Sequence, residues 1–124
     1  MIFYFAAKYR WLLVVKQIAA KVMAQSSHTV AGRWLTGAHD GSSLVDQAQW
    51  AREDLDDIDQ SDCLVIFQLP IDEPEHSAGR HIEHGYAIAK GKQIIIVGKS
   101  TSVCQYVPNT TSYPSLDEFY KGIL

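Results

Sequence analysis

The chain has 124 residues, enough for one ordinary hydrophobic core, and we expect a single domain over residues 1–124. Its net charge of −3 excludes the basic field that binding to a nucleic-acid polymer requires, so small molecules are the expected partners. No apolar run approaches the roughly 18 to 20 residues that cross a bilayer, which excludes a membrane span.

The first half of the chain alternates predicted strands with predicted helices. Residues 2–7 form a short apolar run with aromatic side chains, which is typical of a strand. Apolar residues then recur at helical spacing and predict a helix over residues 10–25. Residues 29–35 are a second strand candidate, which a glycine and an arginine weaken. After a loop rich in glycine and serine, apolar residues every three or four positions predict a helix over residues 44–58.

The second half continues the alternation. Residues 63–69 are a continuous apolar run, as expected for a strand that is buried on both faces. A polar loop over residues 70–78 leads to a predicted helix over residues 79–90, which ends at Gly91, a usual C-terminal stop. Residues 93–97 are another predicted strand, apolar in every position after Gln93.

The tail carries a short strand candidate near residues 109–113 and a last predicted helix from about Ser115. Apolar strands that alternate with helices indicate a parallel sheet covered on both faces. We therefore predict an α/β fold, a three-layer, doubly wound (Rossmann or flavodoxin-like) parallel sheet of four or five strands. Such folds bind ligands beyond the carboxyl ends of their strands, for example after Phe5 and Phe67.

The sequence does not favour a metal site. Cys63 and Cys104 make neither a disulfide framework nor a zinc site, which fits a reducing cytoplasm. His81 and His84 are three positions apart on a predicted helix and share a face, but a set of metal ligands needs more partners. We predict no metal, and we expect these histidines to be solvated or to line a substrate site.

Aspartates are dense at the end of the second predicted helix. We expect Asp56, Asp57 and Asp59 to form a solvated face, because acidic side chains near a helix C-terminus do not stabilise the helix. Asp62 adjoins the buried strand, and we expect it to cap or turn the chain there.

Glu83 lies in the first turn of the third predicted helix. Its position has a structural explanation, since the helix dipole favours acidic side chains there by about 0.3 to 1 kcal/mol. Its surroundings favour a functional role. Gly79 before it and Gly85 after it let the backbone approach a ligand closely, and the preceding loop leaves the carboxyl end of a buried strand.

These residues resemble the nucleoside 2-deoxyribosyltransferase superfamily, which includes 2'-deoxynucleoside 5'-phosphate N-hydrolases. The signature of that family is Glu-x-Gly-Tyr-Ala on a helix, then Gly-Lys and an apolar strand. It appears here as Glu83-His84-Gly85-Tyr86-Ala87 and Gly91-Lys92 before the strand at residues 93–97.

Two further signatures fall in the same order along the chain. An aspartate eight residues before another that opens the middle strand matches Asp54 and Asp62. A tyrosine inside the first strand matches Tyr4. The resemblance covers most of the chain, from Met1 to about Ser100.

The resemblance implies an enzyme in which Glu83 attacks the anomeric carbon of a nucleoside, expels the base and forms a glycosyl-enzyme ester. Water or a second base then takes the sugar, as in retaining glycosidases. It implies that Asp54 helps to protonate the departing base and that Tyr4 orients Glu83 by a hydrogen bond. The resemblance implies no metal or organic cofactor. It implies a homodimer or a larger homo-oligomer.

The resemblance also indicates the substrate class. Ser77 stands where the hydrolases have a serine that contacts the 5'-phosphate, and Lys8 and Arg10 partly match their phosphate loop, which here lacks its glycine and serine. A surface charge with no contact to the substrate explains Arg10 equally well. We expect Gly79 and Arg80 to border the same substrate site. The predicted activity is cleavage of the N-glycosidic bond of a nucleoside 5'-monophosphate or nucleoside, by hydrolysis or transfer, and the alternative is a non-catalytic nucleotide-binding or sensing module.

Overall fold

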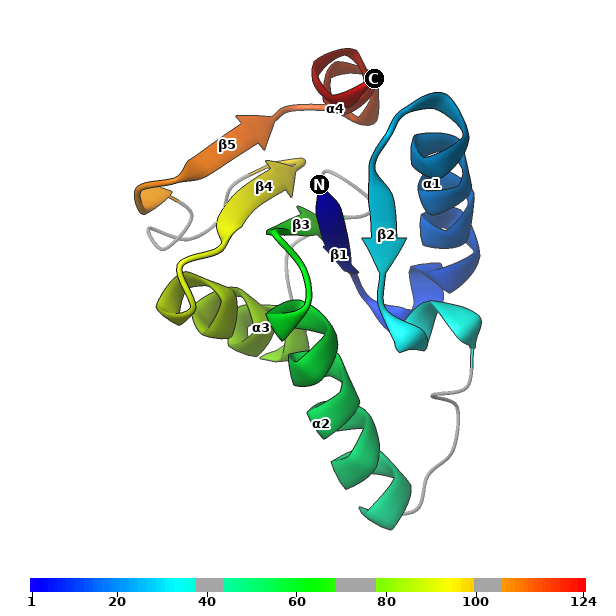
Figure 1. Cartoon of the computed structure of the whole chain (residues 1–124), viewed down its shortest axis with the longest axis vertical. Coiled ribbons are helices and arrows are strands. Elements are labelled where there is room, and N and C mark those ends of the chain that lie inside the picture. Colours follow the sequence, from blue (N-terminus) through cyan, green and yellow to red (C-terminus); the bar gives the residue numbers. More distant parts are fainter. Residues whose placement is uncertain (38–43, 69–77, 100–105) are drawn as a thin grey trace.

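Five parallel strands form one sheet in the order β2-β1-β3-β4-β5, and helices cover both of its faces (Figure 1). The computed structural model describes residues 1–37, 44–68, 78–99 and 106–124. The strands are β1 (Ile2–Ala6), β2 (Thr29–Ala31), β3 (Cys63–Phe67), β4 (Gln93–Val97) and β5 (Thr110–Tyr113). This is the flavodoxin-like strand order, so the predicted three-layer α/β fold is confirmed.

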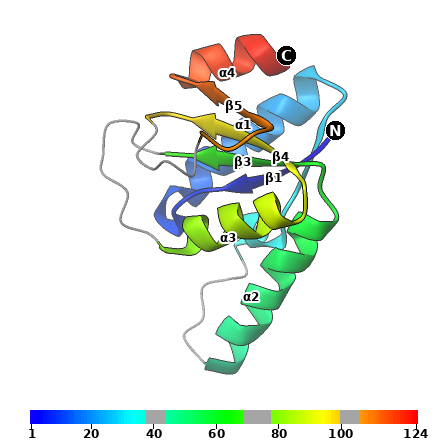
Figure 2. The same ribbon diagram turned by 90° about the vertical axis from the view of Figure 1, so that its left-hand side faces the viewer.

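The helices alternate with the strands along the chain. The α-helices are α1 (Leu12–Gln25), α2 (Leu44–Asp59), α3 (Ala78–Ala89) and α4 (Leu116–Ile123), and two short 3-10 helices are η1 (Tyr9–Trp11) and η2 (Arg33–Thr36). Helices α1 and α4 cover one face of the sheet, and α3 with the end of α2 covers the other (Figure 2). The ammonium of Lys21 on α1 lies 4.0 Å from the ring centre of Tyr120 on α4, which places these two helices side by side.

The central strands provide the core. All five residues of β3 are buried, as expected for an apolar strand between two helical layers. Phe67 packs edge to face against Phe5 of β1 and Phe119 of α4, with ring centres 4.9 Å and 5.6 Å away. Burying side chains of this size contributes about 1.5 to 3 kcal/mol each, so the middle of the sheet is the most stable part of the fold.

Asp62 fixes the start of this sheet. Its Oδ2 accepts a hydrogen bond of 2.8 Å from the backbone N–H of Ile2, and the backbone N–H of Asp62 donates in turn to the carbonyl of Ile2. The predicted capping role of Asp62 therefore acts across two strands, where β1 and β3 begin side by side.

The second strand is shorter than predicted. It ends at Ala31, and the chain turns at Gly32, whose φ of 126° favours glycine, into η2 instead of extending to residue 35. The reason is tertiary: Trp34 is buried, and its indole N–H donates to the carbonyl of Phe5 at 2.9 Å. Helix α1 likewise begins at Leu12 because the preceding residues form η1.

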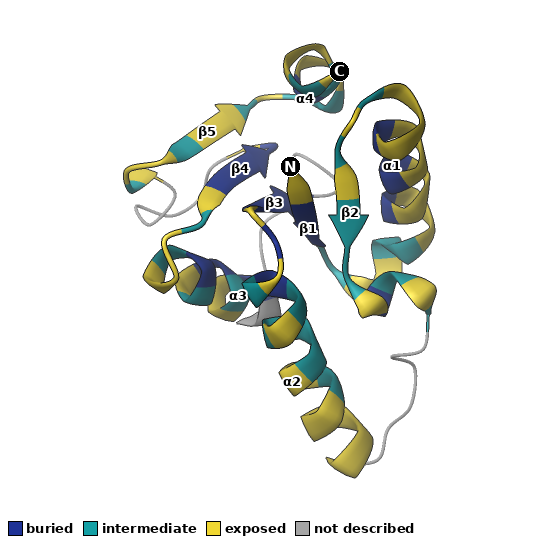
Figure 3. Ribbon diagram, viewed as in Figure 1, coloured by how far each residue is buried: buried dark blue, intermediate teal, exposed yellow. Residues whose placement is uncertain are grey.

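Helix α2 projects away from the body of the molecule (Figure 1). Its first half is exposed, and within the helix Ile58 is the buried residue (Figure 3). The side chains near its C-terminal end therefore determine where the helix lies. Over the part of the chain that the structure describes, each helix is too short or too polar to cross a membrane.

Candidate active site

A cavity of about 360 Å³ lies at the carboxyl ends of the first strands, on the side of α2 and α3. Its walls come from β1 and the segment after it, from η2, and from the facing sides of α2 and α3. The lining residues are Tyr4, Ala7, Tyr9, Trp34, Gln47, Trp50, Ala51, Asp54, Arg80 and Glu83. The cavity thus occupies the edge of the sheet where this fold binds ligands.

Glu83 projects from the second turn of α3 into this cavity. Its Oε2 atom is fully enclosed and has no hydrogen-bond partner among the described residues. Burial raises the pKa of Glu83 to about 7, a hydrogen bond from Tyr4 opposes the shift, the charge of Asp54 adds to it, and that of Arg80 opposes it. A buried carboxyl group with a raised pKa that lines a cavity is typical of a residue that reacts with a bound molecule.

Tyr4 supports this carboxylate from the floor of the site. It lies in the middle of β1, is 1% exposed, and donates a hydrogen bond to Glu83. Burial, followed by the nearby charges of Glu83 and Asp54, raises the pKa of Tyr4 far above its ordinary value. Tyr4 therefore stays protonated and acts as a permanent donor to Glu83.

Asp54 enters the cavity from the opposite wall, on α2. A second, smaller hollow of about 180 Å³ adjoins the first, and Ala51, Asp54 and Glu83 line both. The two carboxyl groups are close enough for the charge of Asp54 to raise the pKa of Glu83. The structure thus brings together Tyr4, Asp54 and Glu83, and their chemical roles stay predictions.

Arg80 lies one turn before Glu83 and lines the same cavity. It is 3% exposed, and its Nη1 donates to the carbonyl of Phe67, the last residue of β3, at 2.8 Å. Burial lowers the pKa of the Arg80 guanidinium, and the charge of Glu83 opposes this shift. Arg80 is therefore a buried cation held beside the carboxylate, which is a suitable position for stabilising negative charge.

The family model of the nucleoside 2-deoxyribosyltransferases matches residues 3–115, which includes all of these side chains. The chain belongs to this family. The resemblance to this family that the sequence indicated is thus confirmed over nearly the whole length of the chain, and membership places the chain among enzymes of the nucleoside deoxyribosyltransferase and N-glycosidase kind.

Two solved structures share the fold of this deoxyribosyltransferase family member. The CMP N-glycosidase BcmB from Clostridium botulinum superposes with a TM-score of 0.64 at 19% sequence identity, over 98% of this chain and 97% of that one. A 2-desoxiribosyltransferase from Leishmania mexicana gives a TM-score of 0.57 at 17% identity, over 81% of this chain and 65% of that one. At these identities the likeness shows the fold alone. No curated protein matches the chain in sequence.

The remaining predicted substrate contacts of this family member are not placed in the cavity. Lys8 and Arg10 follow β1 but are not among the described residues that line it, and the guanidinium of Arg10 lies 5.5 Å from the ring centre of Trp11. Ser77 lies outside the described residues, and Gly79 belongs to the first turn of α3. Their roles in binding a phosphate stay predictions.

Several lining residues were not predicted as substrate contacts. Tyr9, Trp34, Gln47 and Trp50 give the cavity an aromatic wall with one amide. A sequence signal existed for two of them, because Gln47 and Trp50 precede Asp54 by seven and four positions and so share its helix face. No such signal existed for Trp34, whose burial depends on its bond to a distant strand.

The prediction of a solvated aspartate face is correct for Asp56, which is exposed, and wrong for Asp57 and Asp59. Asp57 binds the side chain and backbone of Arg33, at 2.8 to 3.3 Å. Asp59 accepts hydrogen bonds of 2.8 and 2.9 Å from the hydroxyl of Tyr86 on α3. These two aspartates attach α2 to the rest of the molecule, with partners that lie 24 and 27 positions away in the sequence.

The two histidines of α3 have different environments. His81 is exposed, whereas His84 is 4% exposed and is not among the residues that line the cavity. The expectation of a solvated side chain is therefore wrong for His84, which lies with Arg80 and Ala87 on the buried side of the helix, and its role in lining a substrate site stays a prediction. Burial lowers the pKa of His84, and the charge of His81 lowers it further. Among the described residues, no cluster of acidic, histidine or cysteine side chains could hold a metal ion.

Proposed function

We propose that the chain cleaves the N-glycosidic bond of a nucleoside 5'-monophosphate or nucleoside, with Glu83 as the nucleophile. The observation that carries this proposal is the convergence of Glu83, Asp54 and Tyr4 on one cavity. Membership of a family of nucleoside deoxyribosyltransferases supports the reaction class. The cavity volume of about 360 Å³ lies in the range of small-molecule sites, and its tryptophan and tyrosine side chains suit a planar base.

The first step forms a bond from a Glu83 oxygen to the anomeric carbon and breaks the bond from that carbon to the base nitrogen. The electron pair of the broken bond stays on the base, and Asp54 supplies the proton. In the second step water adds to the anomeric carbon, its proton returns to Asp54, and the Glu83 carboxylate is released. A second base in place of water gives transfer instead of hydrolysis.

The electrostatics of the site support Glu83 as the nucleophile. Tyr4 and Arg80 both stabilise the ionised form of Glu83, whereas burial and the charge of Asp54 oppose it and raise the pKa of Glu83 to about 7. A carboxyl group with a pKa near neutral is ionised in a large fraction of the molecules at physiological pH, as a nucleophile must be. In this proposal Asp54 supplies the proton for the departing base.

The test is a set of nucleosides and nucleoside 5'-monophosphates, CMP among them because the C. botulinum protein of the same fold is a CMP N-glycosidase. Chromatography measures the release of free base by the purified protein and by Glu83→Ala. We expect release by the wild type and none above background by the variant. Equal rates would remove Glu83 from the mechanism. Binding that raises the melting temperature without any base release would favour the non-catalytic module.

We also propose that the chain forms a homodimer or larger homo-oligomer. Leu44 and Val45, at the projecting end of α2, are 81% and 76% exposed, and Ile82 beside the cavity is 65% exposed. Apolar side chains this exposed are typical of contact surfaces. Light scattering after size exclusion should give a multiple of the 13.9 kDa chain mass, and a monomer at all concentrations would contradict it.

A further inference from the structure

The position of Asp54 depends on how α2 is attached to the body of the molecule. The first half of this helix is exposed, and Ile58 near its end is its buried residue. Asp54 lies between these two parts, and its neighbour Leu55 is only partly buried where it packs against the core. Core packing therefore holds this turn from one side, and polar contacts on another side of the helix can add to the placement of the Asp54 carboxyl opposite Glu83.

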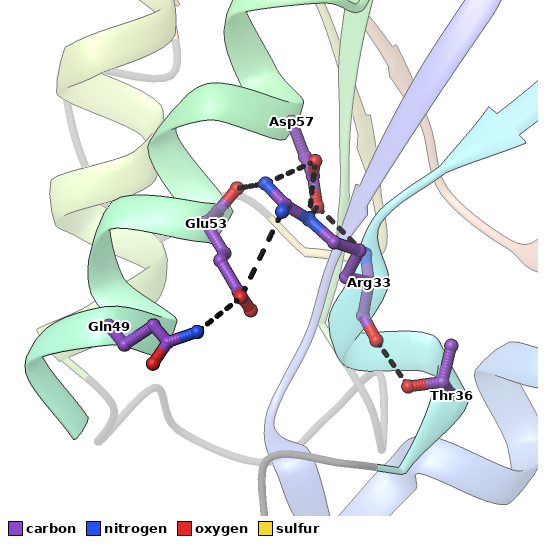
Figure 4. A network of polar contacts seen from close by, with 5 residues as sticks. All are labelled: Arg33, Thr36, Gln49, Glu53 and Asp57. Carbon is purple, nitrogen blue, oxygen red and sulfur yellow. Dashed lines mark hydrogen bonds and ion pairs between the residues drawn. The ribbon is translucent and has the colours of Figure 1, made fainter. Parts of the chain in front are cut away.

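Arg33 makes such contacts from η2, with partners that lie 20 and 24 positions later in the sequence (Figure 4). Its backbone N–H donates to Asp57 Oδ2 at 2.8 Å, and its Nε and Nη2 lie 3.1 Å from Asp57 Oδ1. Its Nη2 also donates to the backbone carbonyl of Glu53 at 3.2 Å. Gln49 steadies the Glu53 side chain, with its amide donating to Oε1 at 3.1 Å.

These bonds enclose the turn of α2 that carries Asp54. Glu53 and Asp57 are four positions apart, so they are neighbours on one side of the helix, and Asp54 lies in the turn between them. The residue after Arg33 points the other way. Trp34 lines the cavity and donates to the carbonyl of Phe5 in β1. Two adjacent residues of η2 thus connect α2 to the strand that carries Tyr4.

We propose that Arg33 is a positioning residue for the reaction, and that its bonds to Glu53 and Asp57 hold the Asp54 turn of α2 against the Glu83 carboxylate. The inference rests on the proposed function for its catalytic consequence. Its structural part, the placement of Asp54 relative to Glu83, does not need turnover to be tested. We call the set Arg33, Glu53 and Asp57 the α2 clamp.

The geometry of the α2 clamp suits positioning better than stability. The Arg33 side chain is 51% exposed, and an exposed ion pair adds little to the stability of a fold. A guanidinium fork bound to a carboxylate and a backbone carbonyl nevertheless fixes direction and distance, which a lysine cannot reproduce. The α2 clamp therefore determines where the helix lies without being necessary for folding.

A matched control is present at the last residue of α2, Asp59. The Lys90 side chain is 49% exposed and lies 3.6 Å from Asp59 Oδ1, so it also forms a surface ion pair with α2. Asp59 keeps its hydrogen bonds from Tyr86 when Lys90 is truncated. Lys90→Ala thus removes a similar charge pair from α2 without releasing the Asp54 turn.

The kinetic experiment compares wild type, Arg33→Ala, Arg33→Lys, Asp57→Asn and Lys90→Ala. Misplacing a catalytic group by about 1 Å costs about 100-fold, so we expect kcat to fall between about 10-fold and 100-fold in Arg33→Ala and Asp57→Asn. The double variant should lose less than the product of the two single losses, because Arg33 and Asp57 act through one shared set of bonds. Arg33→Lys should recover part of the rate. Wild-type kcat in Arg33→Ala would overturn the proposal.

The second experiment is independent of turnover. Glu83 is faced by Tyr4 from β1, Asp54 from α2 and Arg80 from its own helix, and of these the α2 clamp controls Asp54. Carbon NMR of glutamate-labelled protein follows the Glu83 titration, assigned with Glu83→Gln. Its midpoint should move to lower pH in Arg33→Ala, because Asp54 moves away, and stay unchanged in Lys90→Ala. If the wild type lacks turnover, the proposed function fails, whereas an unmoved midpoint in Arg33→Ala overturns the α2 clamp.

Discussion

Helices α3 and α2 each carry one carboxyl group of the candidate pair, yet the molecule holds them in different ways. Along α3, Arg80, His84 and Ala87 are buried, and Arg80 is bonded to the end of β3. Along α2, Ile58 is the buried residue and Leu55 packs partly buried against the core, while polar bonds of Asp57 and Asp59 make further attachments. The core therefore fixes Glu83 more firmly, whereas the placement of Asp54 depends in addition on bonds that can be removed without unfolding the chain.

The largest effect that tests this comparison should come from Asp54 itself. Asp54→Asn cannot donate a proton to the departing base, and general acid catalysis contributes about 10²- to 10⁴-fold, so kcat should fall by that amount. A substrate with a better leaving base should lose less, because it needs less protonation. Steady-state kinetics on two substrates measures both effects. An equal loss with both would assign Asp54 a role other than the acid.

The two arginines should differ in stability. Arg80→Met leaves the buried carbonyl of Phe67 without its donor, which should lower the free energy of unfolding by about 1 to 3 kcal/mol. Arg33→Ala removes an exposed ion pair and should lower it by at most about 1 kcal/mol. Urea unfolding of both variants and of the wild type measures these free energies. A larger loss for Arg33→Ala would show that α2 is part of the stable core.

Tyr4→Phe should have a smaller effect on catalysis. It removes the hydrogen bond that lowers the pKa of Glu83, so the pKa should rise above about 7 and less of the enzyme is ionised at neutral pH. We expect kcat/KM to fall about 10-fold at pH 7, as for the loss of one hydrogen bond to a charged group, and to recover partly at higher pH. A pH profile identical in shape to that of the wild type would contradict the contact.

The last expected effect concerns the pH dependence of stability. The pKa of Glu83 rises from its ordinary value of 4.5 to about 7 on folding, so between these pH values the native state holds a proton that the unfolded chain releases. The free energy of unfolding should therefore fall as the pH rises through this range, on the order of 1 to 3 kcal/mol. Glu83→Gln should lack this contribution. The free energy of unfolding is measured at pH 5 and at pH 8 for the wild type and for Glu83→Gln. An equal change between the two pH values in both proteins would mean that the Glu83 carboxyl is exposed to solvent and that its pKa is not raised.

The sequence was most informative where local pattern and tertiary structure agree. The predicted bounds of strand β4 match the structure to the residue. The reason is that its apolar run after Gln93 lies between Gly91-Lys92 and Gly98, which leaves no other place for the strand to begin or end. The Glu83 motif was visible for the same reason, since its glycines and its helix are local. Strand β2 was overpredicted because the bond from Trp34 to the carbonyl of Phe5 turns the chain there.

What the sequence could not provide is the set of long-range polar partners. Asp57 looks like any solvated helix charge until Arg33, 24 positions earlier, is placed beside it. Arg80 was predicted to contact the substrate, yet its burial against the end of β3 follows only from the packing of α3 on the sheet. The candidate trio of Tyr4, Asp54 and Glu83 was thus found from sequence signatures, whereas the contacts that place these residues were found from the fold.

The central claim is that Glu83 becomes covalently attached to the sugar. The most direct measurement is to mix the enzyme with a substrate from the active class, stop the reaction in acid within its first turnover, and analyse the peptides by mass spectrometry. The account predicts a glycosyl ester on the peptide that contains Glu83, and none in Glu83→Gln. Base release by the wild type with no adduct on that peptide at any time, or an adduct on another residue, would contradict it.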